Sequence, residues 1–191
     1  LNSSGVKARY STPGAALWIS ALGGERGMNS SIYGGLIGSS DTLPGIMTTG
    51  KSSCSRGSVR AGSGYVVNSF QDGDSPHSEN PSCSYTSTFA GTSAAAPTVT
   101  GVVAQMLEAN PALTWRDVKH ILASTARQVD TTFDATDIST VTYLKWRENS
   151  AGFKFHNWYG FGAIDANAAV NSALSYTAGQ LGSQKSLSLT T

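Results

Sequence analysis

Hydrophobic positions are most regular in the second half of the chain. From Ser93 to Ala109, Ala, Val, Met and Leu fall on nearly every side of a helical wheel, a pattern typical of a helix buried all round. Pro111 ends this segment. Thr114, followed by Asp117 three residues later, resembles a capping box, which predicts the start of a second helix.

The second predicted helix is amphipathic. Its apolar face is formed by Trp115, Val118, Ile121 and Leu122, and its polar face by Arg116, Lys119, His120 and Arg127. The run FKFHNWYGFG over 153–162 then predicts a strand and a turn, and AIDANAAVNSAL over 163–174 predicts a last, Ala-rich helix.

The first half of the chain shows less order. AALWISA, residues 15–21, follows a Pro-Gly turn and predicts a buried strand. From 22 to 88 there is little periodicity and much Gly, Ser and Asn, with short strands expected only over 36–38 and 64–70. So long an irregular stretch is usually functional or an insertion. Residues 178–191 have no core-forming pattern and are expected to be a linker or tail, which leaves 1–177 for the domain.

Composition narrows the classes of partner that this chain is expected to bind. The chain has 191 residues, of which 39% are hydrophobic and 13% charged, and its formal net charge is +1. Binding of nucleic acid by bulk electrostatics is not expected at this charge. No apolar run approaches the roughly 20 residues that span a bilayer, so no membrane partner is expected either.

The two cysteines, Cys54 and Cys83, lie within the Ser/Gly-rich stretch. Their spacing fits no zinc pattern. A disulfide is favoured over two free thiols, because it would restrict the unfolded states of a segment that has little apolar surface. Together with the low charge, this disulfide suggests a secreted, periplasmic or extracellular protein.

One hydroxyl in the segment FAGTSAAAPTVTG, that of Ser93, lies where the first long helix begins. A serine becomes nucleophilic only when a base takes its proton, and a helix N-terminus presents it rigidly beside free N–H groups. Gly91 permits a sharp turn before it, and Pro97 is tolerated only near a helix start. These residues suit a nucleophile and a tightly packed small-residue helix equally well.

GTSAAAP, residues 91–97, resembles the Gly-Thr-Ser-x-Ala-x-Pro nucleophile signature of the subtilisin-like serine proteases at every fixed position. LEANPALTWRDVKHIL over 107–122 and WYGFGAIDANAAV over 158–170 resemble the segments that follow it in the kexin and furin branch. ARYSTPGAALWIS over 8–20 resembles the strand region ahead of it. The resemblance covers about 9–170, and residues 22–85 fit it loosely.

The resemblance implies an α/β fold of three layers with a mostly parallel central sheet, of which this chain would form the C-terminal portion with an insertion at about 22–88. It implies peptide-bond hydrolysis by a Ser-His-Asp triad in which Ser93 is the nucleophile and its backbone N–H an oxyanion donor. Gly91, Thr92 and Pro97 would support this motif. The family's His, Asp and oxyanion Asn motifs are absent, so we expect them in a part of a longer precursor that precedes Leu1.

The histidines present do not replace the missing base. His77 lies at the expected loop tip, His120 on the polar face of its helix, and His156 at a position where kexin-like sequences also tend to carry a histidine, so a structural role is expected for it. Three aspartates, Asp130, Asp134 and Asp137, lie in a variable connection, with no assigned role.

The function expected from the sequence is therefore that of a serine endopeptidase acting on proteins or peptides, with this chain almost inert until its missing half is present. The alternatives are a catalytically inactive subtilisin-like pseudoenzyme or binding module, and a structural domain in which the motif occurs by chance. Kexin-like enzymes use calcium and cut after basic residues, but Thr12 stands where furin-like relatives place an acidic calcium ligand. Calcium, dibasic specificity, and a pro-segment or chaperone partner for the insertion therefore remain open, and no metal ligands are assigned.

Overall fold

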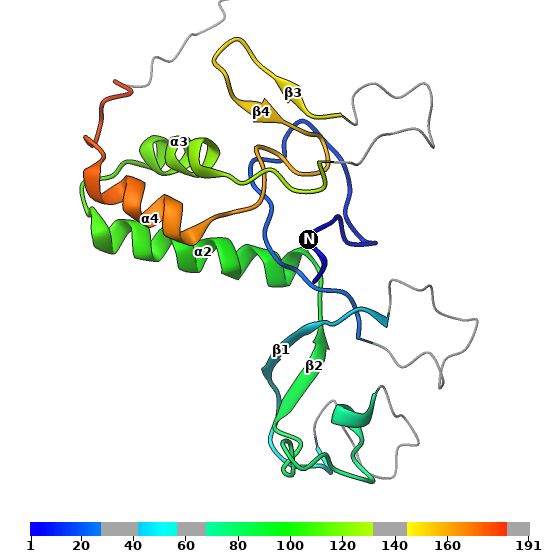
Figure 1. Ribbon diagram of the computed structural model, residues 1–191. Helices are drawn as coiled ribbons and strands as arrows, with labels where there is room; N and C mark the ends of the chain where they lie inside the picture. The colour runs from blue at the N-terminus through cyan, green and yellow to red at the C-terminus, as the bar shows by residue number, and fades with distance from the viewer. Residues whose placement is uncertain (28–41, 57–67, 132–144, 183–191) are drawn as a thin grey trace, which may run out of the picture.

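The computed structural model describes residues 1–27, 42–56, 68–131 and 145–182 (Figure 1). Three helices form the body of the molecule: α2 (Thr92–Ala109), α3 (Trp115–Thr125) and α4 (Ala166–Ser175). Helix α4 packs against both α2 and α3. The long helix predicted from Ser93 to Ala109 and the last Ala-rich helix are both confirmed.

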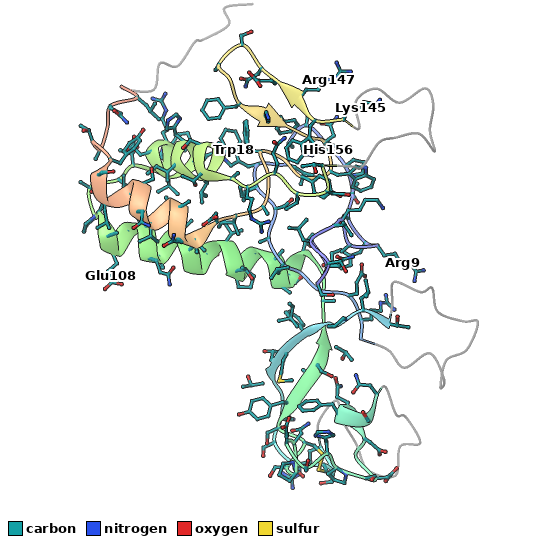
Figure 2. All side chains as sticks on the ribbon, in the orientation of Figure 1. Arg9, Trp18, Glu108, Lys145, Arg147 and His156 are labelled. Atoms are coloured by element: carbon teal, nitrogen blue, oxygen red, sulfur yellow. A yellow bond between two sulfur atoms is a disulfide. The ribbon has the colours of Figure 1, made fainter. Side chains whose placement is uncertain are left out.

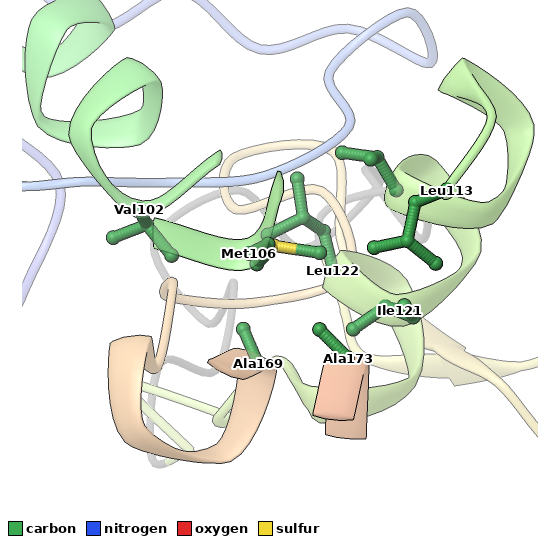
Figure 3. Close-up of a cluster of buried hydrophobic side chains, with 8 residues drawn as sticks. Val102, Met106, Leu113, Ile121, Leu122, Ala169 and Ala173 are labelled. Atoms are coloured by element: carbon green, nitrogen blue, oxygen red, sulfur yellow. The ribbon is translucent and has the colours of Figure 1, made fainter. Parts of the chain in front are cut away.

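The hydrophobic core lies where these helices meet (Figure 3). Helix α4 contributes small side chains, Ala169 and Ala173, which let its backbone approach the larger side chains of its neighbours. Met106 and Ile121 are fully buried. The buried members of this core are Val102, Met106, Leu113, Val118, Ile121, Leu122, Ala169 and Ala173.

Two predictions about helix faces are wrong. Helix α2 is not buried all round: Leu107 remains 40% exposed, because among the described residues only one face of α2 is covered by other helices. Trp115 does not join the apolar face of α3 but is 62% exposed, since it lies in the first turn, beyond the reach of the core. Arg127, placed on the polar face of this helix, lies beyond its end at Thr125.

The capping box that begins α3 is confirmed. The Thr114 hydroxyl accepts a hydrogen bond from the Asp117 N–H, and the Asp117 carboxylate accepts one from the Thr114 N–H at 2.9 Å. The same carboxylate oxygen accepts two further bonds, from the Thr114 hydroxyl at 2.7 Å and from the N–H of Gly179 at 2.9 Å. Asp117 therefore joins the start of α3 to the segment that follows α4.

The sheet structure is sparse in the described residues. Strand β1 (Ile46–Thr49) pairs with β2 (Tyr85–Phe89), and β3 (Arg147–Glu148) with β4 (Lys154–Phe155), both antiparallel. The strand and turn predicted over 153–162 correspond to β4 and the turn after it. Of the expected parallel sheet, these residues contain a single bridge, between Ser20 and Ala163.

The strand predicted over 15–21 is wrong in extent and in burial. This segment bonds to the segment after β4, where the Phe161 N–H donates to the Trp18 carbonyl at 2.9 Å and the Ile164 N–H to the Ser20 carbonyl at 2.8 Å. On its other side the amino group of the first residue, Leu1, donates to the Ala21 carbonyl at 2.8 Å; this limited pairing forms a bridge rather than a strand, and Trp18 is 36% exposed. The strand predicted over 36–38 lies outside the described residues. In place of the one predicted over 64–70, the described part leads into a 3₁₀ helix, η3 (Ser69–Gln71).

Strands β1 and β2, η3 and the described residues between them form an arm that extends away from the helices (Figure 1). A disulfide joins Cys54 to Cys83, with 4.9 Å between their Cα atoms. The interior of the arm is polar: Gln71 and Asn80 are each 2% exposed. The Gln71 side-chain oxygen accepts from the N–H and hydroxyl of Ser87, and the Asn80 side-chain oxygen accepts from the Tyr85 N–H. In the described part of the arm, hydrogen bonds thus take the place of a hydrophobic core.

In the described parts of the chain, no helix is both long enough and apolar enough to cross a membrane.

Candidate active site

Ser93 is the second residue of α2, directly after the arm returns to the body through β2. Its side chain is exposed. Strand β2 ends at Phe89, and only Ala90 and Gly91 separate it from the helix. A strand, a two-residue turn and a long helix therefore fix the direction of the chain on both sides of Ser93.

Gly91 makes this turn with φ of 110° and ψ of 179°, a conformation that side-chain-bearing residues rarely adopt. The N–H of Gly91 donates to the carbonyl of Gly23 at 3.0 Å, and its own carbonyl accepts from the N–H groups of Ala94 and Ala95 at 3.0 and 3.2 Å. The turn is therefore held from two sides: by the segment around Gly23 and by the helix that it begins.

Gly23 and Gly45 were not predicted as part of the site. A Cβ on Gly23 would lie 2.7 Å from the Gly91 carbonyl oxygen, and one on Gly45 would lie 2.5 Å from the Ser87 carbonyl oxygen. Their missing side chains let three backbone segments lie side by side next to the nucleophile turn. The glycine pair at 23–24, directly after the apolar run, was the sequence signal for this close approach.

The N–H group of Ser93 points to the N-terminal end of α2, where backbone donors have no partner within the helix. Among the described residues neither this N–H nor the Ser93 hydroxyl has a hydrogen-bond partner, and no side chain caps the helix. The aligned peptide dipoles add partial positive charge there. An anionic oxygen beside Ser93 would therefore meet a free donor and a favourable field.

Pro97 removes the N–H that would otherwise bond the Ser93 carbonyl. Side-chain hydrogen bonds stabilise the next turns of the helix. The Thr98 hydroxyl donates to the Ala94 carbonyl, and the Thr100 hydroxyl donates to the Ala96 carbonyl, each at 3.1 Å. The helix continues through the proline to Ala109, so the first turn keeps its position at the start of a rigid element.

A cavity of about 100 Å³ lies against this first turn. Thr92 and Ala95 line it from α2, and Leu17, Ile19 and Trp158 add much of its apolar surface. Apolar side chains next to the nucleophile turn are thus left facing an open space.

The structure brings none of the three histidines into hydrogen-bond contact with Ser93. His77 packs its ring on Phe70 in the arm, and its Nδ1 accepts from the Glu79 N–H. His120 lies against the rings of Phe153 and Tyr176.

His156 is buried next to the β3–β4 hairpin (Figure 2). Its Nδ1 accepts from the Trp158 N–H at 3.0 Å, and its ring contacts Trp146 and Tyr159. It organises the turn that follows β4.

Of the aspartates in the variable connection, Asp130 is described, and it contacts Tyr159. Asp130 accepts a hydrogen bond of 2.5 Å from the Tyr159 hydroxyl. Burial and this carboxylate raise the pKa of Tyr159 well above its usual value, so the hydroxyl stays protonated. Asp134 and Asp137 lie outside the described residues.

Among the described residues no three His, Cys, Asp or Glu side chains gather as a metal-binding group would require. The described site thus consists of an exposed hydroxyl, a free backbone donor and an adjoining apolar cavity.

Comparison with known proteins gives a consistent result. Residues 8–162 match the model of the subtilase family. The extracellular serine protease of Aeromonas sobria is 32% identical over 194 residues, which cover 92% of this chain and 27% of that protein. A PC3-like endoprotease from Hydra vulgaris is 46% identical over 91 residues, covering 48% of this chain and 11% of that protein.

Solved structures agree with this comparison. The crystal structure of the Aeromonas sobria serine protease superimposes with a TM-score of 0.76 at 30% identity, over 93% of this chain and 29% of that one. The same protease in complex with the chaperone ORF2 gives a TM-score of 0.73. This chain therefore has the fold of part of a subtilisin-like protease, and it spans about a tenth to about a quarter of the length of these curated relatives.

Proposed function

This chain belongs to the subtilase family, and we therefore propose that Ser93 is the nucleophile of a serine endopeptidase. The observation that carries this proposal is the presentation of Ser93: an exposed hydroxyl in the first turn of α2, held by the Gly91 turn, with a backbone N–H that has no partner in the described residues. The match of residues 91–97 to the family's nucleophile signature lies at this turn.

In the proposed reaction, Ser93 Oγ attacks the carbonyl carbon of a peptide bond. The carbonyl oxygen becomes an oxyanion and accepts a hydrogen bond from the Ser93 N–H, at the positive end of the α2 dipole. The leaving amine takes a proton, and water then hydrolyses the acyl-serine. A histidine must first accept the Ser93 proton and then donate it to the amine.

We propose that this histidine, its orienting aspartate and a second oxyanion donor come from polypeptide outside these 191 residues. His77, His120 and His156 each have other contacts, as described above. The apolar cavity beside Thr92 and Ala95 supports the proposal, because it offers a surface on which further polypeptide can pack next to Ser93. Without the base, the rate of acylation should fall by several powers of ten.

The substrates that we propose are proteins or peptides, and the location is outside the cell, in line with the extracellular relative from Aeromonas. A chaperone or pro-segment partner is proposed because the Aeromonas protease is known in complex with a chaperone. The disulfide-linked arm, which leads directly into the Ser93 turn, is the part of this chain proposed to meet such a partner or to limit the access of substrates to Ser93. We assign no calcium site, since no group of candidate ligands is evident among the described residues.

A fluorophosphonate probe, which reacts covalently with activated serines, tests the proposal. In the protein expressed at its full natural length, we expect labelling that is lost in Ser93→Ala and kept in Ser78→Ala, a variant of another exposed serine in the arm. The 191-residue chain by itself should label more slowly by several powers of ten, because it lacks the base. A full-length protein that is folded by circular dichroism yet unlabelled at Ser93 would instead support a catalytically inactive binding module.

A further inference from the structure

A second cavity, of about 320 Å³, is lined by α3 and by aromatic residues from other segments, and it shares no residue with the Ser93 turn. Trp115 lies on its α3 side, Trp18 on the segment before the Ser20 bridge, and Phe153 and Phe161 on the segments around β4. Figure 2 shows Trp18 beside α3. The volume suits one or two amino-acid residues or a small molecule rather than a folded domain.

The aromatic walls are fixed by contacts with one another. The ring centroids of Trp18 and Phe161 lie 4.8 Å apart in an edge-to-face arrangement, and those of Phe153 and Phe161 lie 5.9 Å apart. The Trp18 indole N–H donates to the Lys119 carbonyl at 2.9 Å, which ties this ring to α3. A ligand would therefore meet a largely preformed apolar surface.

The charge of this cavity is one-sided. Arg116 and Lys119 line it, and no carboxylate from the described residues does. The Lys119 ammonium lies 3.9 Å from the ring centroid of Trp18 and 5.9 Å from that of Trp115, and it has no acidic partner among the described residues. Arg116 donates from Nη1 to the Gly182 carbonyl at 2.8 Å, which leaves other guanidinium donors for a ligand.

Cations over aromatic rings, without a counter-ion, complement a ligand that carries a negative charge next to an apolar group. Leu181 lines the same cavity and adds an aliphatic side chain to its wall, while its neighbour Gly182 bonds Arg116.

We propose that this cavity binds the C-terminal end of a peptide whose last residue is aromatic or leucine-like. The last side chain would lie between Trp18 and Trp115, and the free α-carboxylate would accept hydrogen bonds from Lys119 and Arg116. This is a binding site separate from Ser93, and it does not depend on the function proposed for that serine.

Titration of the full-length protein with N-acetyl-L-phenylalanine, followed by tryptophan fluorescence and calorimetry, tests this proposal. N-acetyl-L-phenylalaninamide has the same ring and lacks the charge. We expect saturable binding of the acid, and binding of the amide that is weaker by about tenfold, the usual effect of losing a charge-assisted hydrogen bond. Lys119→Gln should remove most of this difference while keeping the hydrophobic part of the side chain.

Two further variants test whether binding depends on the residues of this cavity. Lys51→Gln removes a positive charge from the exposed part of the arm and should leave the binding of both compounds unchanged. Trp115→Leu changes a side chain that is 62% exposed, so the fold should tolerate it, and binding of the acid should weaken several-fold. Equal binding of acid and amide, equal effects of Lys119→Gln and Lys51→Gln, or no saturable binding to a folded protein would overturn the proposal.

Discussion

At Gly91 the backbone adopts a positive φ, while the space around the position is open: a Cβ placed there would meet only the Ser93 nitrogen, at 3.9 Å. Substitution of this glycine therefore acts through backbone strain and not through a clash. The strain would fall on the turn that holds Ser93.

Gly91→Ala should lower the free energy of unfolding by about 1 to 3 kcal/mol, the usual cost of a residue forced into such a conformation. It should also slow fluorophosphonate labelling at Ser93 in the full-length protein. Urea unfolding and labelling rates measure the two effects.

Gly101→Ala is the matched control, because Gly101 lies within α2, is exposed, and has open space where its Cβ would be. Alanine there should raise the free energy of unfolding by about 1 kcal/mol, since glycine is a poor residue for a helix interior. If both variants changed stability in the same direction, strain at Gly91 would not be the cause.

At the scale of single elements, α3 depends on a buried carboxylate. The hydrogen bond from the Gly179 N–H, together with those from Thr114, lowers the pKa of Asp117 below its usual value despite its burial. A carboxyl whose pKa is lower in the folded state stabilises the fold above its unfolded pKa. That stabilisation is lost as the pH falls through the folded pKa.

The stability of the wild type should therefore decline more steeply below about pH 4 than that of Asp117→Asn, which has no such proton to bind. At neutral pH the variant should be the less stable of the two, because an amide cannot replace all three accepted hydrogen bonds. Urea midpoints measured between pH 3 and pH 7 compare the two proteins. Parallel curves across this range would show that Asp117 does not contribute in this way.

The sequence predicted these elements best where the signal was local. The Thr114–Asp117 capping box and the helix that ends before Pro111 depend on residues three or four positions apart, and both are present. The faces of the helices were harder, since Trp115 is apolar and in phase with Val118 and Leu122 but remains 62% exposed among the described residues. Gly23 was missed because its contact with Gly91 joins distant parts of the chain.

At the scale of the whole molecule, the main contacts between elements fall into separate groups. Strand β2 packs against both β1 and η3 in the arm, and α4 packs with α2 and α3 in the body. The resemblance of residues 91–97 and their flanks gave the family and the fold class, which depend on motifs. It did not give the arrangement of the arm, because residues 22–85 fit the family pattern loosely.

Removal of the disulfide should therefore act on the arm. The Cys54→Ser/Cys83→Ser double variant opens a cross-link between residues 29 positions apart, which the chain-entropy estimate values at about 3 to 4 kcal/mol. Hydrogen exchange should become faster at the amides of β2, and remain unchanged in the cores of α2, α3 and α4.

A matched control removes a weaker link between the same two segments. The hydroxyls of Ser52 and Ser84 lie 3.1 Å apart, and Ser52→Ala/Ser84→Ala deletes this hydrogen bond without breaking a covalent connection. Its effect on β2 exchange should be small. Faster exchange throughout the helices of the cysteine variant would show instead that arm and body unfold as one unit.

The polar interior of the arm also affects how the molecule responds to temperature. The heat capacity of unfolding rises with the apolar surface that becomes exposed and falls with the polar surface. Among the described residues of the arm, Gln71 and Asn80 are the buried polar side chains and Cys83 is also buried, so opening the arm exposes much amide surface, and its stability should change nearly linearly with temperature. The helical body, whose core is aliphatic, should follow a curved profile and weaken on cooling as well as on heating. In the cold, the arm that leads to Ser93 would therefore lose less of its stability than the body that carries the helix.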